Sequence, residues 1–90
     1  MRYEWDETKR RKNLKKHGLD FADAEKVFAG KTYSIWDDRF EDEVRYVTLG
    51  LLRDQVVLIV HTESDEVIRV ISMRRASKYE EAAYFEHVAD

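Results

Sequence analysis

The feature that most constrains the fold is a dense run of β-branched residues from Gln55 to Arg75. The run reads QVVLIVHTE, then SDEV, then IRVISMRR, so a short polar segment at Ser64-Asp65 separates two apolar stretches. Val and Ile fit a pleated surface better than a helix, and a polar break between two such stretches is typical of a β-hairpin. We therefore predict a hairpin that is buried over much of its length.

Polar side chains interrupt this apolar hairpin near the ends of its strands. Because side chains alternate across a strand, His61 and Glu63 share a face of the first strand. On the returning strand Arg69 and Arg74 have opposite parity, so they point to one side only if the strand ends or bulges near Met73. Polar groups this close to a core are either structural pairs or a functional site.

Composition restricts the class of protein. Ninety residues form one domain, 1–90, and 43% hydrophobic with 39% charged residues predicts a small core under a charged surface. The chain has no cysteine, which excludes disulfides and thiolate metal sites. The N-terminus has no apolar signal region, and no apolar run is long enough for a bilayer, so we expect a cytoplasmic protein with no membrane role.

The net charge of −3 hides a segregation of sign along the chain. Lys9 to Lys16 carries six cations and no acid, and Arg69 to Lys78 carries four cations and no acid. The acids gather in WDDRFEDE and in YEEAAYFEHVAD. A basic helix and a basic strand end predict a local positive patch, although the overall acidity counts against nucleic-acid binding.

The rest of the chain reads as short strands and helices with recognisable end signals. Helix-end signals predict a first helix that begins after Asp6 and runs to His17, and a second helix at 20–29. A terminal helix is expected from near Ser77, with Glu80 at capping-box spacing from it. Strands are expected at 2–5, 33–37 and 45–52, with an exposed acidic loop through Glu43 and a turn at Arg53-Asp54.

This order of elements predicts the fold class. Successive strands joined by short turns pair antiparallel, and two early helices can cover one face of the resulting sheet. We expect an α+β domain with a mostly antiparallel sheet of about five strands, two N-terminal helices packed on it and a C-terminal helix.

Three segments resemble a known family: the opening YEWDETKRRKNLKKHGLDF, the middle RYVTLG and the close VHTESDEVIRVISMRRASKYEEAAY. They are similar to the BrnT-type toxins, ribonuclease toxins of type II toxin-antitoxin pairs with a RelE-like fold. The resemblance covers nearly the whole chain. It implies a metal-independent endoribonuclease that cleaves mRNA, inhibits translation and growth, and needs no cofactor. It also implies a BrnA-type antitoxin, a heterotetramer, and operator DNA bound only through the antitoxin complex.

Metal-free RNA cleavage needs a base for the 2′-hydroxyl, an acid for the leaving oxygen and cations for the phosphate. Histidine suits proton transfer and arginine suits phosphate, which makes His61, Arg69 and Arg74 the catalytic candidates. Parity favours His61 with Arg69, with Arg74 second. The RNA-binding candidates are Lys9, Lys12, Arg75 and Lys78. No His or Glu spacing argues for a metal site.

Each candidate also has a structural interpretation. His61 can donate to a carbonyl or to Glu63, and Arg69 can pair with Glu63 or Glu66. The lysine run is equally typical of a solvated helix face, and His17 before the glycine suits a helix C-cap. Tyr79 and Tyr84 have the spacing of core residues, although either is able to stack a base.

The alternative function is a non-catalytic protein-binding module, an inactive toxin homologue that holds an antitoxin and contributes to operator binding. The overall acidity supports this reading. Trp36, Phe40, Tyr84 and Phe85 near loops or the terminal helix predict an apolar patch that a partner covers.

Overall fold

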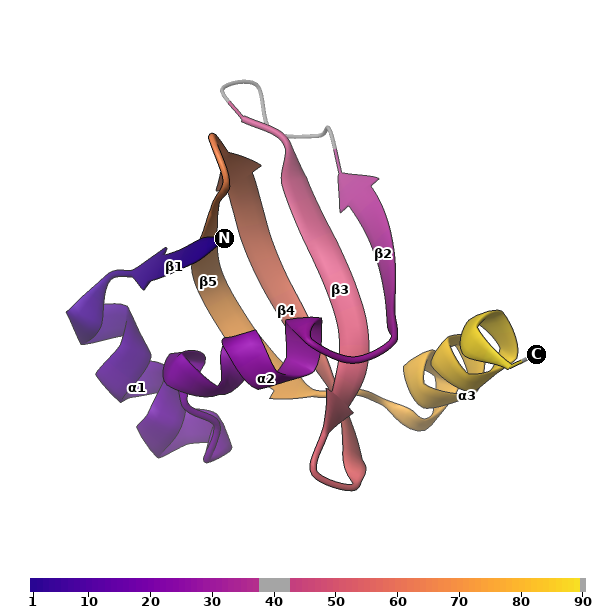
Figure 1. Ribbon diagram of the computed structural model, residues 1–90. Coiled ribbons are helices and arrows are strands. Elements are labelled where there is room, and N and C mark those ends of the chain that lie inside the picture. Colours follow the sequence, from indigo (N-terminus) through magenta and orange to yellow (C-terminus); the bar gives the residue numbers. More distant parts are fainter. Residues whose placement is uncertain (38–42, 90) are drawn as a thin grey trace.

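The computed structural model describes residues 1–37 and 43–89, which form one five-stranded sheet with helices around it (Figure 1). The sheet order is β1-β5-β4-β3-β2. The strands are β1 (Arg2–Trp5), β2 (Thr32–Asp37), β3 (Arg45–Leu52), β4 (Gln55–Ser64) and β5 (Val67–Arg75). The helices are α1 (Glu7–His17), the 3₁₀ turn η1 (Phe21–Asp23), α2 (Ala24–Phe28) and α3 (Lys78–Val88). In the described part of the chain, none of these helices has the length and apolarity to span a membrane.

The α+β class is confirmed, but the sheet is mixed where we expected it to be mostly antiparallel. β2, β3, β4 and β5 pair antiparallel in turn, whereas β1 pairs parallel to β5, from Arg2 opposite Val67 to Trp5 opposite Val70. The expectation rested on short turns between neighbouring strands. β1 is joined to its partner by most of the chain, so no hairpin fixes its direction.

The expected pair of N-terminal helices is also corrected, because only α1 is a full helix. The Asp6 side chain accepts a hydrogen bond from the Lys9 amide at its start, and Gly18 ends it with a φ of 71°. The predicted helix at 20–29 is instead the turn η1 followed by the five residues of α2. Asp20 caps the turn through the Ala22 amide, which starts the chain in the tighter 3₁₀ form.

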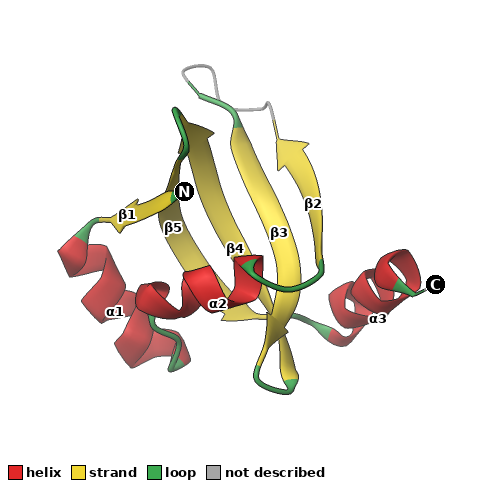
Figure 2. Ribbon diagram, viewed as in Figure 1, coloured by secondary structure: helices red, strands yellow, loops and turns green. Residues whose placement is uncertain are grey.

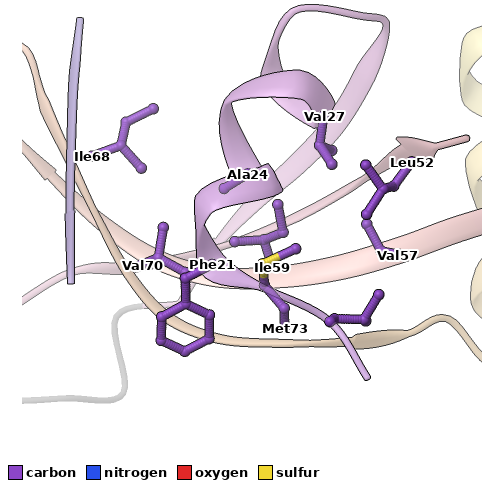
Figure 3. Close-up of a cluster of buried hydrophobic side chains, with 10 residues drawn as sticks. Phe21, Ala24, Val27, Leu52, Val57, Ile59, Ile68, Val70 and Met73 are labelled. Carbon is purple, nitrogen blue, oxygen red and sulfur yellow. The ribbon is translucent and has the colours of Figure 1, made fainter. Parts of the chain in front are cut away.

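The sheet has two unlike faces. We call the side under η1 and α2 the α2 face, and the opposite side the α3 face, since α3 packs over one end of it (Figure 2). The main core lies on the α2 face, where helix and strand side chains interdigitate (Figure 3). Its buried members are Leu19, Phe21, Ala24, Val27, Leu52, Val57, Ile59, Ile68, Val70 and Met73. A smaller cluster, of Leu49, Val56, Leu58 and Tyr84, fixes α3 to the opposite face.

α1 lies at an edge of the sheet, where β5 extends beyond its pairing with β1 (Figure 1). The buried Asn13 makes this contact: its Oδ1 accepts a hydrogen bond from the Met73 amide at 3.3 Å, and its Nδ2 donates to the Leu19 carbonyl at 3.1 Å. Asn13 therefore satisfies a strand amide that no neighbouring strand reaches. This contact places the basic helix directly beside β5.

The terminal helix follows the prediction. Ser77 caps α3 through the Glu80 amide, at 3.2 Å, and the Glu80 carboxylate returns to the Ser77 amide at 2.9 Å. This reciprocal arrangement is the capping box that the Ser-x-x-Glu spacing predicted. It fixes the start of α3 immediately after the end of β5.

Candidate active site

A β-bulge in β5 decides which way the arginines point. Val60 of β4 pairs with Ser72, but the next residue, His61, pairs with Val70, so Ile71 is an extra residue in β5. Residues opposite each other in a sheet share a face. Arg74 lies opposite Leu58, and Arg69 lies opposite Thr62. Both arginines therefore lie on the α3 face, as the condition of a bulge near Met73 required.

Arg74 is held by an acidic residue of α3. Its Nη1 and Nη2 donate to the two carboxylate oxygens of Glu80 at 2.8 and 2.9 Å, which is the paired geometry of strong arginine-carboxylate contacts. The hydrogen bonds from Arg74 lower the pKa of Glu80 to about 2, and the same contact raises the pKa of Arg74. Glu80 thus joins the helix cap to the arginine and sets the direction of its side chain.

Arg69 has a looser partner. A single hydrogen bond of 3.3 Å joins its Nη1 to Oε1 of Glu4 on β1, and the two side chains are 48% and 53% exposed. Neither predicted pairing of Arg69, with Glu63 or Glu66, is the one that forms. An ion pair this exposed contributes little to stability, so an incoming anion can compete for Arg69.

His61 lies on the other side of the sheet. Its side chain is 1% exposed, and its ring lies between those of Phe28 and Tyr46, with centroids at 5.0 and 5.6 Å. Its Nε2 is 2.7 Å from the hydroxyl of Thr48, which in turn is 2.7 Å from the hydroxyl of Ser34. Burial lowers the pKa of His61 to about 4.

The predicted pair of His61 with Arg69 is therefore not formed. His61 lies opposite Val70, a core residue of the α2 face, while Arg69 points to the α3 face. The alternation of side chains within each strand was correctly predicted. Which β5 residues share a face with His61, however, depends on the extra residue at the bulge. Oε1 of Glu63 lies 3.6 Å from Nδ1 of His61, so the structural partner we considered is close but beyond hydrogen-bond distance.

The four RNA-binding candidates divide into two groups. Lys9 and Lys12 line a hollow between α1 and β5, beside the bulge. Arg75 lies opposite Val57 on the α2 face, away from the other two arginines, and Lys78 is the first residue of α3. The two lysines thus lie beside β5, the strand that carries Arg69 and Arg74. Arg75 belongs to the same strand but points to the opposite face of the sheet.

Sequence reasoning missed Glu80 and Glu4 as partners of the arginines. For Glu80 a signal was present, because its capping-box position fixes it one turn into α3, within reach of the preceding strand end. For Glu4 there was none, since its proximity to Arg69 depends on the parallel pairing of β1 with β5. In the described residues, no three His, Asp or Glu side chains are grouped as a metal site requires.

The predicted apolar patch does not form as one surface. Trp36 and Phe85 are 66% and 49% exposed. Trp36 pairs with Tyr46, which lies opposite His61 on the α2 face, whereas Phe85 belongs to α3 on the other side of the sheet. Tyr84 is instead 1% exposed, and its hydroxyl donates to the Lys31 carbonyl at 2.9 Å, so the core interpretation of Tyr84 was the correct one. Tyr79 is 86% exposed, contrary to its core-like spacing, and Phe40 lies outside the described residues.

Comparison with protein families identifies the family to which the chain belongs. A family model described as the ribonuclease toxin BrnT of type II toxin-antitoxin systems matches residues 5–80. This segment runs from the end of β1 to Glu80 and includes all the arginines and lysines discussed above. A search of curated proteins finds no match to the chain.

Proposed function

Because the chain belongs to the BrnT family of ribonuclease toxins of type II toxin-antitoxin systems, we propose that it is a metal-independent endoribonuclease toxin. The family implies an RNA target and an antitoxin partner. We further propose that cleavage inhibits translation and growth in the cytoplasm, and that the domain is a RelE-like ribonuclease fold.

The observation that supports this proposal is the placement of Arg69 and Arg74 on one face of β5 by the bulge. Attack of a ribose 2′-hydroxyl on the adjacent phosphorus places negative charge on the phosphate oxygens. A guanidinium offers a planar pair of donors to such oxygens. The nucleophile belongs to the RNA itself, so the protein has to orient the strand and stabilise this charge.

The two arginines suit different parts of that task. Arg74 is oriented by Glu80 and is 44% exposed, so one side of its guanidinium remains open to a phosphate. Arg69 has the weaker partner and is the more readily released. We assign the phosphate chemistry to these two residues. The catalytic role predicted for His61 stays a prediction, and its 1% exposure favours a structural role beneath the sheet.

We propose a BrnA-type antitoxin as the partner, in a heterotetramer that contacts operator DNA only through the antitoxin. Family membership supports an antitoxin. The exposed Phe85 of α3 offers an apolar side chain for it to cover on the α3 side of the sheet.

One observation favours the second candidate, a binding module without catalysis. Both arginines are engaged by carboxylates, and the only predicted proton-transfer residue is buried. In this reading the open face of the sheet serves to hold the antitoxin.

The test is RNA cleavage by the purified chain, with and without EDTA, for the wild type and for the Arg69→Ala, Arg74→Ala and Arg11→Ala variants. We expect cleavage that survives the chelator, leaves cyclic-phosphate or 3′-phosphate ends, and falls at least a hundredfold in the first two variants. Arg11, an exposed residue of α1, is the matched control and should retain activity. Absence of cleavage by folded wild-type protein that still binds its antitoxin would favour the binding module.

A further inference from the structure

β2 is the last strand of the sheet, and one of its two edges is open (Figure 1). In the part of the chain that the structure describes, β3 is the one strand that pairs with it. A strand at the end of a sheet presents backbone amides and carbonyls to any extended segment that approaches it. At the other end of the sheet, β1 has four residues, and Asn13 of α1 covers the β5 amide beyond it. The long open edge is therefore that of β2.

β2 lacks the features that usually keep an edge strand from pairing. Such strands are protected by a proline, a charged side chain, a bulge or a short length. β2 has six residues, pairs with β3 in an unbroken register, and carries no charge from Thr32 to Trp36. The chain contains no proline. Ile35 and Trp36 are 52% and 66% exposed, on opposite faces of the strand. An open, apolar edge of this kind is typical of a strand that pairs with another one.

α3 contacts the start of β2 and leaves the following residues exposed. The Tyr84 hydroxyl donates to the Lys31 carbonyl at 2.9 Å, and the centroids of the Tyr33 and His87 rings lie 3.9 Å apart. The next three residues, 34–36, are exposed. The helix thus holds the first residues of β2 in the extended form, so a partner strand meets an edge that is already ordered.

A second copy of the chain fits this edge by its own sequence. Residues opposite each other in antiparallel strands share a face, so a two-fold axis between two copies passes where a residue lies opposite itself. With Ser34 at the axis, Tyr33 lies opposite Ile35 of the second copy, and Thr32 lies opposite Trp36 of the second copy. Each aromatic residue then faces a β-branched one, which is a favourable cross-strand pair.

Charge favours this register over the adjacent one. Lys31 and Asp37 stand at the two ends of the strand with opposite charge, so the Ser34 axis places each lysine opposite an aspartate of the other copy. An axis at Ile35 would place Asp37 opposite Tyr33 and Lys31 opposite a residue outside β2. Opposite charges that face each other stabilise a strand pair. Because the two ends of one strand complement each other, a second copy is the occupant that the sequence of β2 specifies.

We propose that the isolated chain forms a two-fold symmetric dimer in which β2 pairs antiparallel with β2 of a second copy. The two sheets then join into one continuous sheet, and the dimer is closed because each copy has used its open edge. The proposal goes beyond the proposed function and does not depend on it, since β3 and β4 separate β2 from the strand that carries Arg69 and Arg74.

The test places one thiol at the axis. Because the chain has no cysteine, Ser34→Cys gives a single thiol in each copy. In the proposed dimer the two thiols belong to residues directly opposite each other, with Cα atoms roughly 4.5–5.5 Å apart, which is within the range of a disulfide. Oxidised glutathione should therefore convert most of this variant into a covalent dimer. Sedimentation equilibrium of the wild type should approach twice the chain mass as the concentration rises.

The matched control is Thr32→Cys, which lies on the same face of the same strand. Its two thiols would be four positions apart along the strands, roughly 13 Å, which is too far for a disulfide. This variant should sediment as a dimer and yet form little covalent dimer. Equal cross-linking of the two variants would overturn the proposal, because chance collisions would then explain it. A wild type that stays monomeric at every concentration would also overturn it.

A charge exchange tests whether the occupant is a second copy in this register. Lys31→Glu places like charges opposite each other at both ends of the dimer, and it should weaken dimerisation roughly five- to tenfold. Adding Asp37→Lys to it exchanges the two signs and should restore most of the affinity. A double variant that dimerises as weakly as Lys31→Glu would overturn the register. No readout here involves RNA, so a lack of nuclease activity would refute the proposed function alone.

Discussion

Acidification should destabilise this protein through His61 before most carboxylates are protonated. The imidazole is 1% exposed, and its Nε2 is 2.7 Å from the Thr48 hydroxyl. Burial lowers the pKa of His61 from 6.5 to about 4, against a smaller opposite effect of the Thr62 backbone. The folded state therefore holds His61 neutral at a pH where the unfolded chain has already taken up a proton.

The sign and size of the effect follow from this difference in pKa. Between pH 6.5 and about 4 the unfolded chain binds the extra proton, so the free energy of unfolding falls as the pH falls. Each unit within that window costs about 1.4 kcal/mol, which gives a loss of about 2 kcal/mol at pH 5 and about 3 kcal/mol in full. Glu63, 3.6 Å from Nδ1, would reduce the loss if it approached the protonated ring.

The assay is urea denaturation at pH 7.5 and pH 5, followed by tryptophan fluorescence, for the wild type and the His61→Gln variant. Glutamine has no titrating group, and its amide can reach the Thr48 hydroxyl in place of Nε2. We expect the wild type to lose about 2 kcal/mol between the two pH values and the variant to lose much less. His87→Gln, a change in α3, is the control and should retain the pH dependence of the wild type.

Two results would refute this reasoning. One is the same pH dependence in the wild type and in His61→Gln. The other is an NMR titration that finds the pKa of His61 near 6.5, because solvent would then reach the ring. Either result would restore His61 as a candidate for proton transfer, which the packing described above opposes.

Three further predictions concern the scaffold and the site. Gly50→Ala would place a methyl group 2.6 Å from a side chain of α2, so it should lower the free energy of unfolding by about 1–3 kcal/mol in urea denaturation, whereas Gly30→Ala, with its nearest atom at 3.8 Å, should not. Asn13→Ala leaves the Met73 amide without its hydrogen-bond acceptor, so it should lower the free energy of unfolding by about 1–3 kcal/mol and speed hydrogen exchange at that amide. Unchanged exchange would show that the Asn13 side chain does not protect the Met73 amide. Glu80→Gln retains the helix cap but loses the ion pair with Arg74, so it should lower the free energy of unfolding by about 1 kcal/mol at pH 7. The difference from the wild type should disappear as the pH falls from 4.5 towards 2, where Glu80 takes up a proton. A difference that does not depend on pH would count against the ion pair.

Much of the architecture was predictable because its signals are local. The strand of Arg45–Leu52 and the hairpin that follows have the expected bounds to within about a residue, since alternation and turn residues are read within a few positions. The same holds for the caps at Asp6 and Ser77, where one side chain satisfies an amide three residues away. Family membership, too, follows from motifs spread along the chain.

The candidate site was predictable in residue types but not in geometry. Arg69 and Arg74 were chosen for their chemistry, and their shared face was stated as conditional on a bulge. His61 was chosen because an imidazole suits proton transfer, and its position in an apolar strand, which supported the structural alternative, proves to be the reason for its burial. Neither outcome can be read from one strand alone.

The sequence by itself determined the identity and order of the strands, the helix ends, the separation of basic from acidic segments and the family. The tertiary structure decided the parallel direction of β1, the extra residue at Ile71, and hence the side of the sheet on which each charged residue lies. The physical reason is that alternation and capping act over a few neighbouring residues. Which side chains of two paired strands share a face depends on how the whole core packs. One inserted residue in a strand turns the side chains beyond it to the opposite face.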